Sequence, residues 1–87
     1  MERNNSVGAR LHIVRIQYDM KQEEFASALE LNRTTISAME RGLFEPSNKT
    51  IDRACDRFGV NKEWLLTGKG DPYIPEKELR ARMLNKM

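Results

Sequence analysis

The sequence predicts an all-α protein, with a compact domain of five helices and a C-terminal helical extension. Apolar residues recur every three or four positions along most of the chain, which is the period of an amphipathic helix. Serine, asparagine and glycine residues suited to helix ends separate these segments. No stretch reads as a convincing β-strand. With 87 residues, the chain has room for one small domain.

The first predicted helix spans residues 6–18. Its apolar residues repeat at steps of four, three and four and form one stripe for the core: Val7, Leu11, Val14 and Tyr18. Arg10 and Arg15 lie off this stripe. Asp19 follows in a turn, where an aspartate tolerates a left-handed backbone better than most residues do.

Two short helices joined by a tight turn are predicted between residues 22 and 42. The first spans 22–29, the turn is 30–32 and the second helix spans 33–41. Asn32 suits the N-cap of the second helix, because its side-chain oxygen can accept a backbone N–H two or three residues on. The inner faces of the pair hold Phe25, Ala26, Leu29, Ile36, Met39 and Glu40.

Two further helices follow in the same domain. Ser47 suits the N-cap of a helix over 48–58, and Asn61 suits that of a short helix over 62–67. The apolar face of the longer helix holds Ile51, Ala54, Cys55 and Phe58. Residues 68–72 contain two glycines and a proline and are expected to form a linker.

A last helix is expected from Pro75, since proline fits the first turn of a helix. Its apolar side comprises Leu79, Met83, Leu84 and Met87. A helix of about a dozen residues is marginal alone in water, so this segment needs a surface to pack on. We therefore expect residues 1–67 to form the domain, and residues 68–87 to form a linker and a helix that can serve dimerisation.

Three runs of residues are weak signals separately but specific in this order and at these separations: KQEEFA, TTISAMERG and FGVNKEWLL. Through them, residues 7–66 resemble the Cro/C1-type (XRE-like) helix-turn-helix family of phage repressors and bacterial transcriptional regulators. The resemblance implies a lambda-repressor-like domain that binds double-stranded DNA. The sequence departs from the family pattern at Asp19, Lys21 and Glu30, where the family tends to have glycine, a capping serine or threonine, and glycine. These departures lower the expected stability of the fold.

In this family the outer face of the second motif helix enters the DNA major groove. The matching candidates for contact with base edges are Arg33, Thr34, Ser37 and Ala38. Arginine can donate two hydrogen bonds to guanine, and alanine can touch a thymine methyl group. The candidates for phosphate contact are Gln22, Asn32, Arg41 and Lys49. Without the resemblance, helical spacing alone would favour an ordinary solvated face.

Arg15 and Glu40 match two family positions that form a partly buried ion pair between the first and third helices. The resemblance also implies a homodimer, because operators with two-fold symmetry require paired groove helices about one DNA turn apart. The candidates for the dimer interface are Trp64, Leu66, Leu79, Met83 and Leu84. The alternatives are a tail that folds back on its own domain and a tail that stays disordered.

No catalytic or metal site is expected. His12 and Cys55 lie on separate predicted helices, so they form neither a nucleophile–base pair nor a set of metal ligands. A single cysteine excludes an internal disulfide and favours a reducing compartment. The chain shows neither a signal peptide nor an apolar run of membrane-spanning length. We expect a cytoplasmic protein that is not an enzyme and needs no cofactor.

The expected function is sequence-specific DNA binding by a transcriptional repressor of phage or prophage type. One alternative is an antitoxin, which would bind DNA while its tail wraps a toxin protein. Another is a protein-interaction module that keeps the fold without reading DNA. That module would have an acidic or apolar outer face, whereas Arg33, Thr34 and Ser37 occupy the face here. The net charge of +2 is only mildly basic, so the case for DNA depends on where the charges lie.

Overall fold

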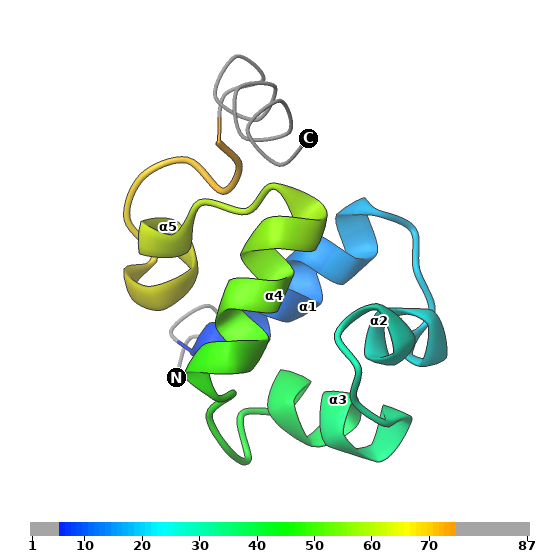
Figure 1. The fold of residues 1–87 in the computed structure, drawn as a ribbon. Coiled ribbons are helices and arrows are strands. Elements are labelled where there is room, and N and C mark those ends of the chain that lie inside the picture. The colour runs from blue at the N-terminus through cyan, green and yellow to red at the C-terminus, as the bar shows by residue number, and fades with distance from the viewer. Residues whose placement is uncertain (1–5, 75–87) are drawn as a thin grey trace.

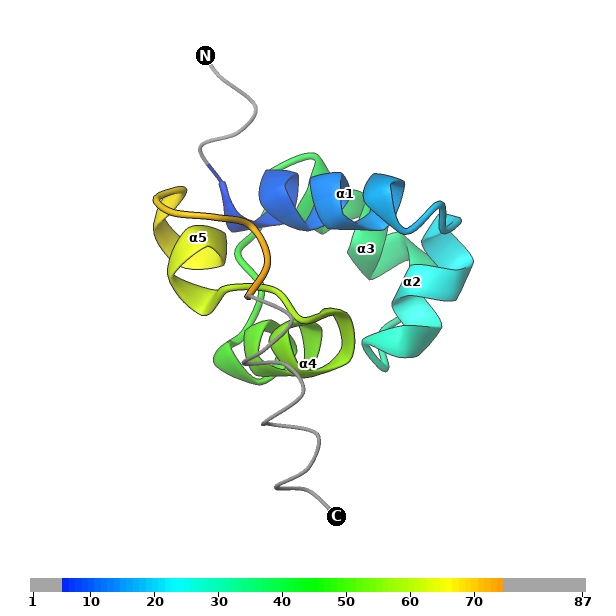
Figure 2. The same cartoon turned by 90° about the horizontal axis from the view of Figure 1, so that it is seen from above.

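The structure is a computed structural model that describes residues 6–74 (Figure 1). It contains the helices α1 (Val7–Gln17), α2 (Gln22–Ala28), α3 (Arg33–Glu40), α4 (Asn48–Phe58) and α5 (Lys62–Thr67). Figure 2 shows α1 and α4 on opposite sides of the domain, with α5 at one end and α2 and α3 at the other. The predicted all-α class is confirmed, and each helix lies within one residue of its predicted bounds. Within residues 6–74, none of the helices is both long and apolar enough to cross a membrane.

The core lies between the five helices, and each helix contributes a side chain with 0% exposure: Leu11, Phe25, Ile36, Ala54 and Leu65. Burying a large apolar side chain of this kind stabilises the fold by about 1.5–3 kcal/mol. Cys55 is a buried free cysteine with 6% exposure, which confirms its reading as a small core residue. The amphipathic pattern therefore specifies most of the interior.

Side-chain caps fix the starts of α1, α3 and α4, as was expected for Asn32 and Ser47. Ser6, Asn32 and Ser47 each accept a hydrogen bond from the backbone N–H three residues on, at 3.0, 2.8 and 3.2 Å. Lys21 precedes α2 and provides no side-chain cap. Its own backbone N–H instead donates to Glu24 Oε1 at 2.8 Å, so one of the two hydrogen bonds of a capping box is present.

Two of the departures from the family pattern lie at left-handed positions. Asp19 has a φ of 54° and Glu30 a φ of 58°. A side chain in this conformation costs roughly 1–2 kcal/mol relative to glycine. Arg53 on α4 partly offsets that cost at Glu30, because its Nε lies 3.2 Å from Glu30 Oε2. Its Nη1 also donates to the carbonyl of Leu29 at 3.1 Å, which ties the turn before α3 to α4.

The structure corrects the predicted core stripe of α1 at Tyr18, which is 47% exposed. Helix α1 ends at Gln17, so Tyr18 is a C-cap residue and leaves the helical face. Its ring packs edge-on against Phe58 with centroids 4.9 Å apart, and its hydroxyl donates to the Phe58 carbonyl at 2.7 Å. The ring therefore covers the edge of the core instead of filling it.

Arg10, which lies off the apolar stripe, is nevertheless only 5% exposed. Its Nε donates to the carbonyl of Leu65 at 2.8 Å, and its Nη2 donates to the carbonyl of Leu66 at 3.1 Å. These are carbonyls at the C-terminal end of α5, where a positive charge is favourable. The guanidinium thus joins α1 to α5 through hydrogen bonds that periodicity cannot reveal.

The expected linker returns to the domain. The backbone N–H of Asn61 donates to the carbonyl of Pro72 at 2.8 Å, and that of Ile74 donates to the carbonyl of Gly59 at 2.9 Å. Val60 and Tyr73 thereby pair in antiparallel orientation. The ordered domain described by the structure reaches at least Ile74. The helix expected from residue 75 onward lies outside the described residues.

Candidate nucleic-acid interface

Helix α3 has one buried and one outward face. Ile36 on the inner face is fully buried, whereas Arg33 and Thr34 at the start of the helix are exposed. Ser37 and Ala38, one turn further on, are partly buried. The outward face offers an arginine fork, two hydroxyl groups and a methyl group. These are groups that can recognise the base edges of a major groove.

The phosphate candidates lie at helix ends, with Gln22 and Lys49 in the first turns of α2 and α4 and Asn32 and Arg41 at the two caps of α3. Asn32, Arg41 and Lys49 are exposed, while Gln22 at the start of α2 is partly buried. Arg41 Nε donates to the carbonyl of Ser37 at 3.3 Å, so its guanidinium is held beside the end of α3. Asn32 and Arg41 thus place a polar group and a positive group at the two ends of α3.

Close contact between α1 and α3 fixes the position of the outward face. Gly8 on α1 faces the carbonyl of Met39 so closely that an added Cβ would lie 1.8 Å from its oxygen. No real Cβ atom reaches that distance, so this helical position requires glycine. The backbones of α1 and α3 therefore meet directly beside the C-terminal end of α3.

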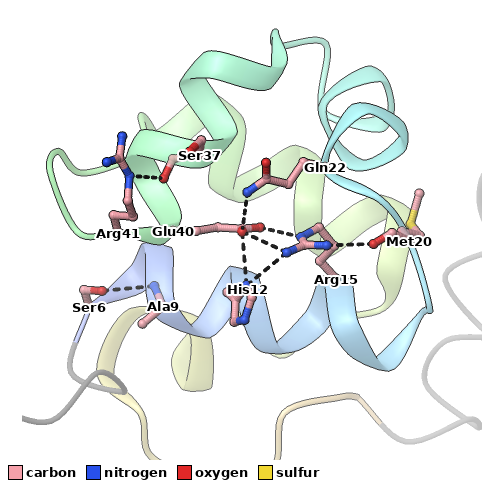
Figure 3. A network of polar contacts seen from close by, with 9 residues as sticks. All are labelled: Ser6, Ala9, His12, Arg15, Met20, Gln22, Ser37, Glu40 and Arg41. Atoms are coloured by element: carbon pink, nitrogen blue, oxygen red, sulfur yellow. Dashed lines mark hydrogen bonds and ion pairs between the residues drawn. The ribbon is translucent and has the colours of Figure 1, made fainter.

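A polar network around Glu40 also joins the two helices (Figure 3). Arg15 donates from Nε to Glu40 Oε2 at 2.7 Å and from Nη2 to Oε1 at 3.1 Å, a two-pronged ion pair. The side chains of Arg15 and Glu40 are 12% and 6% exposed. Arg15 Nη1 also donates to the carbonyl of Met20 at 2.8 Å. Gln22 Nε2 donates to Glu40 Oε1 at 3.2 Å, so the network reaches the start of α2.

Burial raises the pKa of the Glu40 carboxyl, but the hydrogen bonds from Arg15, Gln22 and His12 and the charge of Arg15 lower it by more. The net pKa lies below its usual value, and Glu40 is ionised at neutral pH. The buried carboxylate holds the side-chain amide of Gln22 at the start of α2.

His12 also belongs to the network, although it was not among the residues expected to join Arg15 and Glu40. Its Nδ1 lies 3.0 Å from Glu40 Oε1 and 3.2 Å from Arg15 Nη2. One nitrogen cannot donate to the carboxylate and accept from the guanidinium at once. With a proton on Nδ1 the ring donates to Glu40 Oε1, and the contact with Arg15 Nη2, which itself donates to Glu40, is then not a hydrogen bond. The sequence signal was the spacing of three residues between His12 and Arg15, which places them on one helical face.

The model of a family described as a helix-turn-helix domain matches residues 8–71. The chain belongs to the helix-turn-helix family. The resemblance to Cro/C1-type proteins is thereby confirmed. A protein of Methanocaldococcus jannaschii, described as an uncharacterized HTH-type transcriptional regulator, is 32% identical over 62 residues. The match covers 71% of this chain and 94% of that protein.

The fold is similar to that of a transcriptional regulator from Listeria innocua, known from its crystal structure. The TM-score between the two structures is 0.66. The sequences are 16% identical, and the match covers 93% of this chain and 75% of the other. At that identity the likeness concerns the fold alone. In this helix-turn-helix domain, α2 and α3 are the motif helices.

The candidates for a dimer interface are only partly within the described residues. Trp64 is 8% exposed and packs into its own core, so it offers little surface to a partner. Leu66 is 42% exposed at the end of α5. The remaining candidates lie outside the described residues: Leu79, Met83 and Leu84.

Proposed function

We propose that this helix-turn-helix protein binds double-stranded DNA at specific sequences and represses transcription, as phage and prophage repressors do. The observation that carries the proposal is the outward face of α3, where Arg33 and Thr34 are exposed while Ile36 anchors the opposite face. The description of the M. jannaschii relative as a transcriptional regulator supports it. The proposed role is binding in the cytoplasm, without catalysis or a cofactor.

In the proposed complex α3 lies in the major groove. Arg33 donates two hydrogen bonds to the O6 and N7 atoms of a guanine, and Ala38 touches a thymine methyl group. Thr34 and Ser37 donate to or accept from neighbouring base edges. Phosphate contacts come from Gln22, Asn32, Arg41 and Lys49. Repression follows because the bound protein covers promoter DNA that the polymerase needs.

A selection from random duplexes with the full chain tests this proposal. We expect one sequence motif to be enriched, and transcription from a promoter that contains the motif to fall when the protein is added. Failure to enrich any motif would contradict DNA reading. Increased transcription would retain DNA reading but contradict repression.

We also propose a homodimer, in which Leu66 and the segment after Ile74 contribute the interface. Two-fold operators require two copies of α3 about one DNA turn apart. Light scattering and operator binding should be compared for the full chain and for a chain that ends at Ile74, which keeps the contacts of Pro72 and Ile74. We expect the shorter chain to lose both the dimer and operator affinity. A full chain that stays monomeric and binds a single half-site tightly would contradict the proposal.

A further inference from the structure

The loop after α3 presents two consecutive exposed apolar residues. Leu43 is 66% exposed and Phe44 is 45% exposed. Among the large apolar residues of the described range 6–74, Leu43 is the most exposed. Because the side chain of Leu43 is so exposed to solvent, it contributes little to the stability of the fold. It is therefore available for a contact outside the domain.

The backbone of Leu43 is fixed to α3. Gly42 has a φ of 77°, and its N–H donates to the carbonyl of Met39 at 3.0 Å. The N–H of Leu43 donates to the carbonyl of Ala38, also at 3.0 Å. This pair of bonds is the Schellman motif, in which the residue after the left-handed glycine lies beside the residue five positions earlier. Leu43 therefore adjoins Ala38, a base-edge candidate, instead of moving freely with the loop.

The surroundings of Leu43 favour an anionic partner. Residues 41–49 contain the exposed cations Arg41 and Lys49 and one acidic residue, Glu45. The acidic residue of α3 is Glu40, whose side chain is buried in the ion pair with Arg15. An apolar side chain at the end of a polar, positively charged face matches the major groove of DNA, where phosphates surround the methyl groups of thymines.

We propose that Leu43 extends the base-reading face of α3 and contacts the C5-methyl group of a thymine adjacent to the base pair read by Ala38. This inference rests on the proposed function and adds a specificity-determining residue to it. The methyl group of thymine is the apolar group that base pairs present in the major groove, so an apolar side chain there discriminates thymine.

The test uses the full chain and a selected operator in which each thymine is replaced in turn by deoxyuridine, which lacks only the methyl group. At one thymine we expect the replacement to weaken wild-type binding about 4-fold, because burying one methyl-sized group strengthens an interaction by about that factor. Leu43→Ala should weaken operator binding by about 10-fold, since several carbons lose their contact. The same deoxyuridine should then have no further effect on the variant.

Ile16→Ala is the matched control, because Ile16 is also an exposed apolar residue, at 56%, and lies on α1. It should leave operator affinity and the deoxyuridine pattern unchanged. Thermal unfolding of Leu43→Ala should match wild type, which separates lost contact from lost fold.

Three results would overturn the inference and leave the proposed function standing. If wild type prefers an operator and Leu43→Ala responds to every deoxyuridine as wild type does, Leu43 does not read a methyl group, although the proposed function stands. If Leu43→Ala loses its dimer in light scattering, the partner of Leu43 is a second copy. If the variant weakens all duplexes equally, Leu43 packs on the sugar–phosphate backbone. A wild-type chain that prefers no operator would instead refute the proposed function, and this inference with it.

Discussion

At the scale of single residues, Arg33 and Lys49 are expected to contribute differently to DNA binding, Arg33 to sequence preference and Lys49 to affinity for any sequence. Arg33 is exposed at the first position of α3, whereas Lys49 is exposed in the first turn of α4. Arg33→Ala should cost about 1–3 kcal/mol of operator binding and relax the preference at one base position. Lys49→Ala should weaken binding to all sequences alike and reduce the salt slope by about 1. Repeating the selection with each variant measures both effects. An unchanged motif from Arg33→Ala would show that Arg33 does not read a base.

The same scale includes the ion pair that holds α3 against α1. Glu40→Ala removes a side chain that is 6% exposed and leaves Arg15 without its carboxylate partner. An unpaired buried charge of this kind destabilises by about 3–5 kcal/mol, which urea unfolding detects as a lower midpoint. Asp52→Ala is the control, because Asp52 and its ion-pair partner Lys62 have side chains that are 60% and 55% exposed, and water screens their attraction. The free energy of unfolding of this variant should hardly change. Equal midpoints for Glu40→Ala and wild type would show that the pair is not coupled to folding.

The lowered pKa of Glu40 predicts a dependence of stability on pH. Its carboxyl is more acidic in the folded chain than the usual 4.5, so the ionised form is favoured by folding. This stabilisation is fully present above the unfolded pKa and is lost as the pH falls through the lower, folded pKa. The free energy of unfolding should therefore decrease more steeply for wild type than for Glu40→Gln between about pH 6 and about pH 3. Parallel curves would mean that Glu40 does not contribute.

At the scale of elements, α1 is the scaffold on which α3 and α5 are placed. Gly8 allows the backbone of α3 to approach, and Arg10 binds the last carbonyls of α5. Alanine normally stabilises a helix by about 0.8–1.0 kcal/mol relative to glycine. Gly8→Ala should do the opposite, because its Cβ would lie 1.8 Å from the Met39 carbonyl oxygen. The displacement costs about 1–3 kcal/mol, measured as a lower thermal midpoint. A variant as stable as wild type would contradict this packing.

Helix boundaries followed from the sequence because caps and glycines act locally. Asn32 and Gly59, for example, mark the start of α3 and the end of α4 by their own hydrogen bonding or backbone conformation. The burial of Arg10 and the need for Gly8 were not predictable, since each depends on an element far along the chain. The outward face of α3 was predictable because helical period alone separates it from Ile36.

At the scale of the whole molecule, α2 and α3 lie at the end of the domain opposite α5, and the backbone bonds between residues 59–61 and 72–74 close the chain beside α5. The net charge is only +2, so electrostatic attraction to phosphates is modest overall. In the proposed complex, discrimination between DNA sequences comes from the groups on α3 and from Leu43. Salt should weaken both specific and non-specific binding, while the ratio between them persists.

Sequence-specific binding of DNA can be tested by titrating the full chain with its selected operator and with a scrambled duplex of the same composition, at matched salt. We expect the operator to be bound at least about 10³-fold more tightly than the scrambled duplex. Equal affinities for the two duplexes would contradict it.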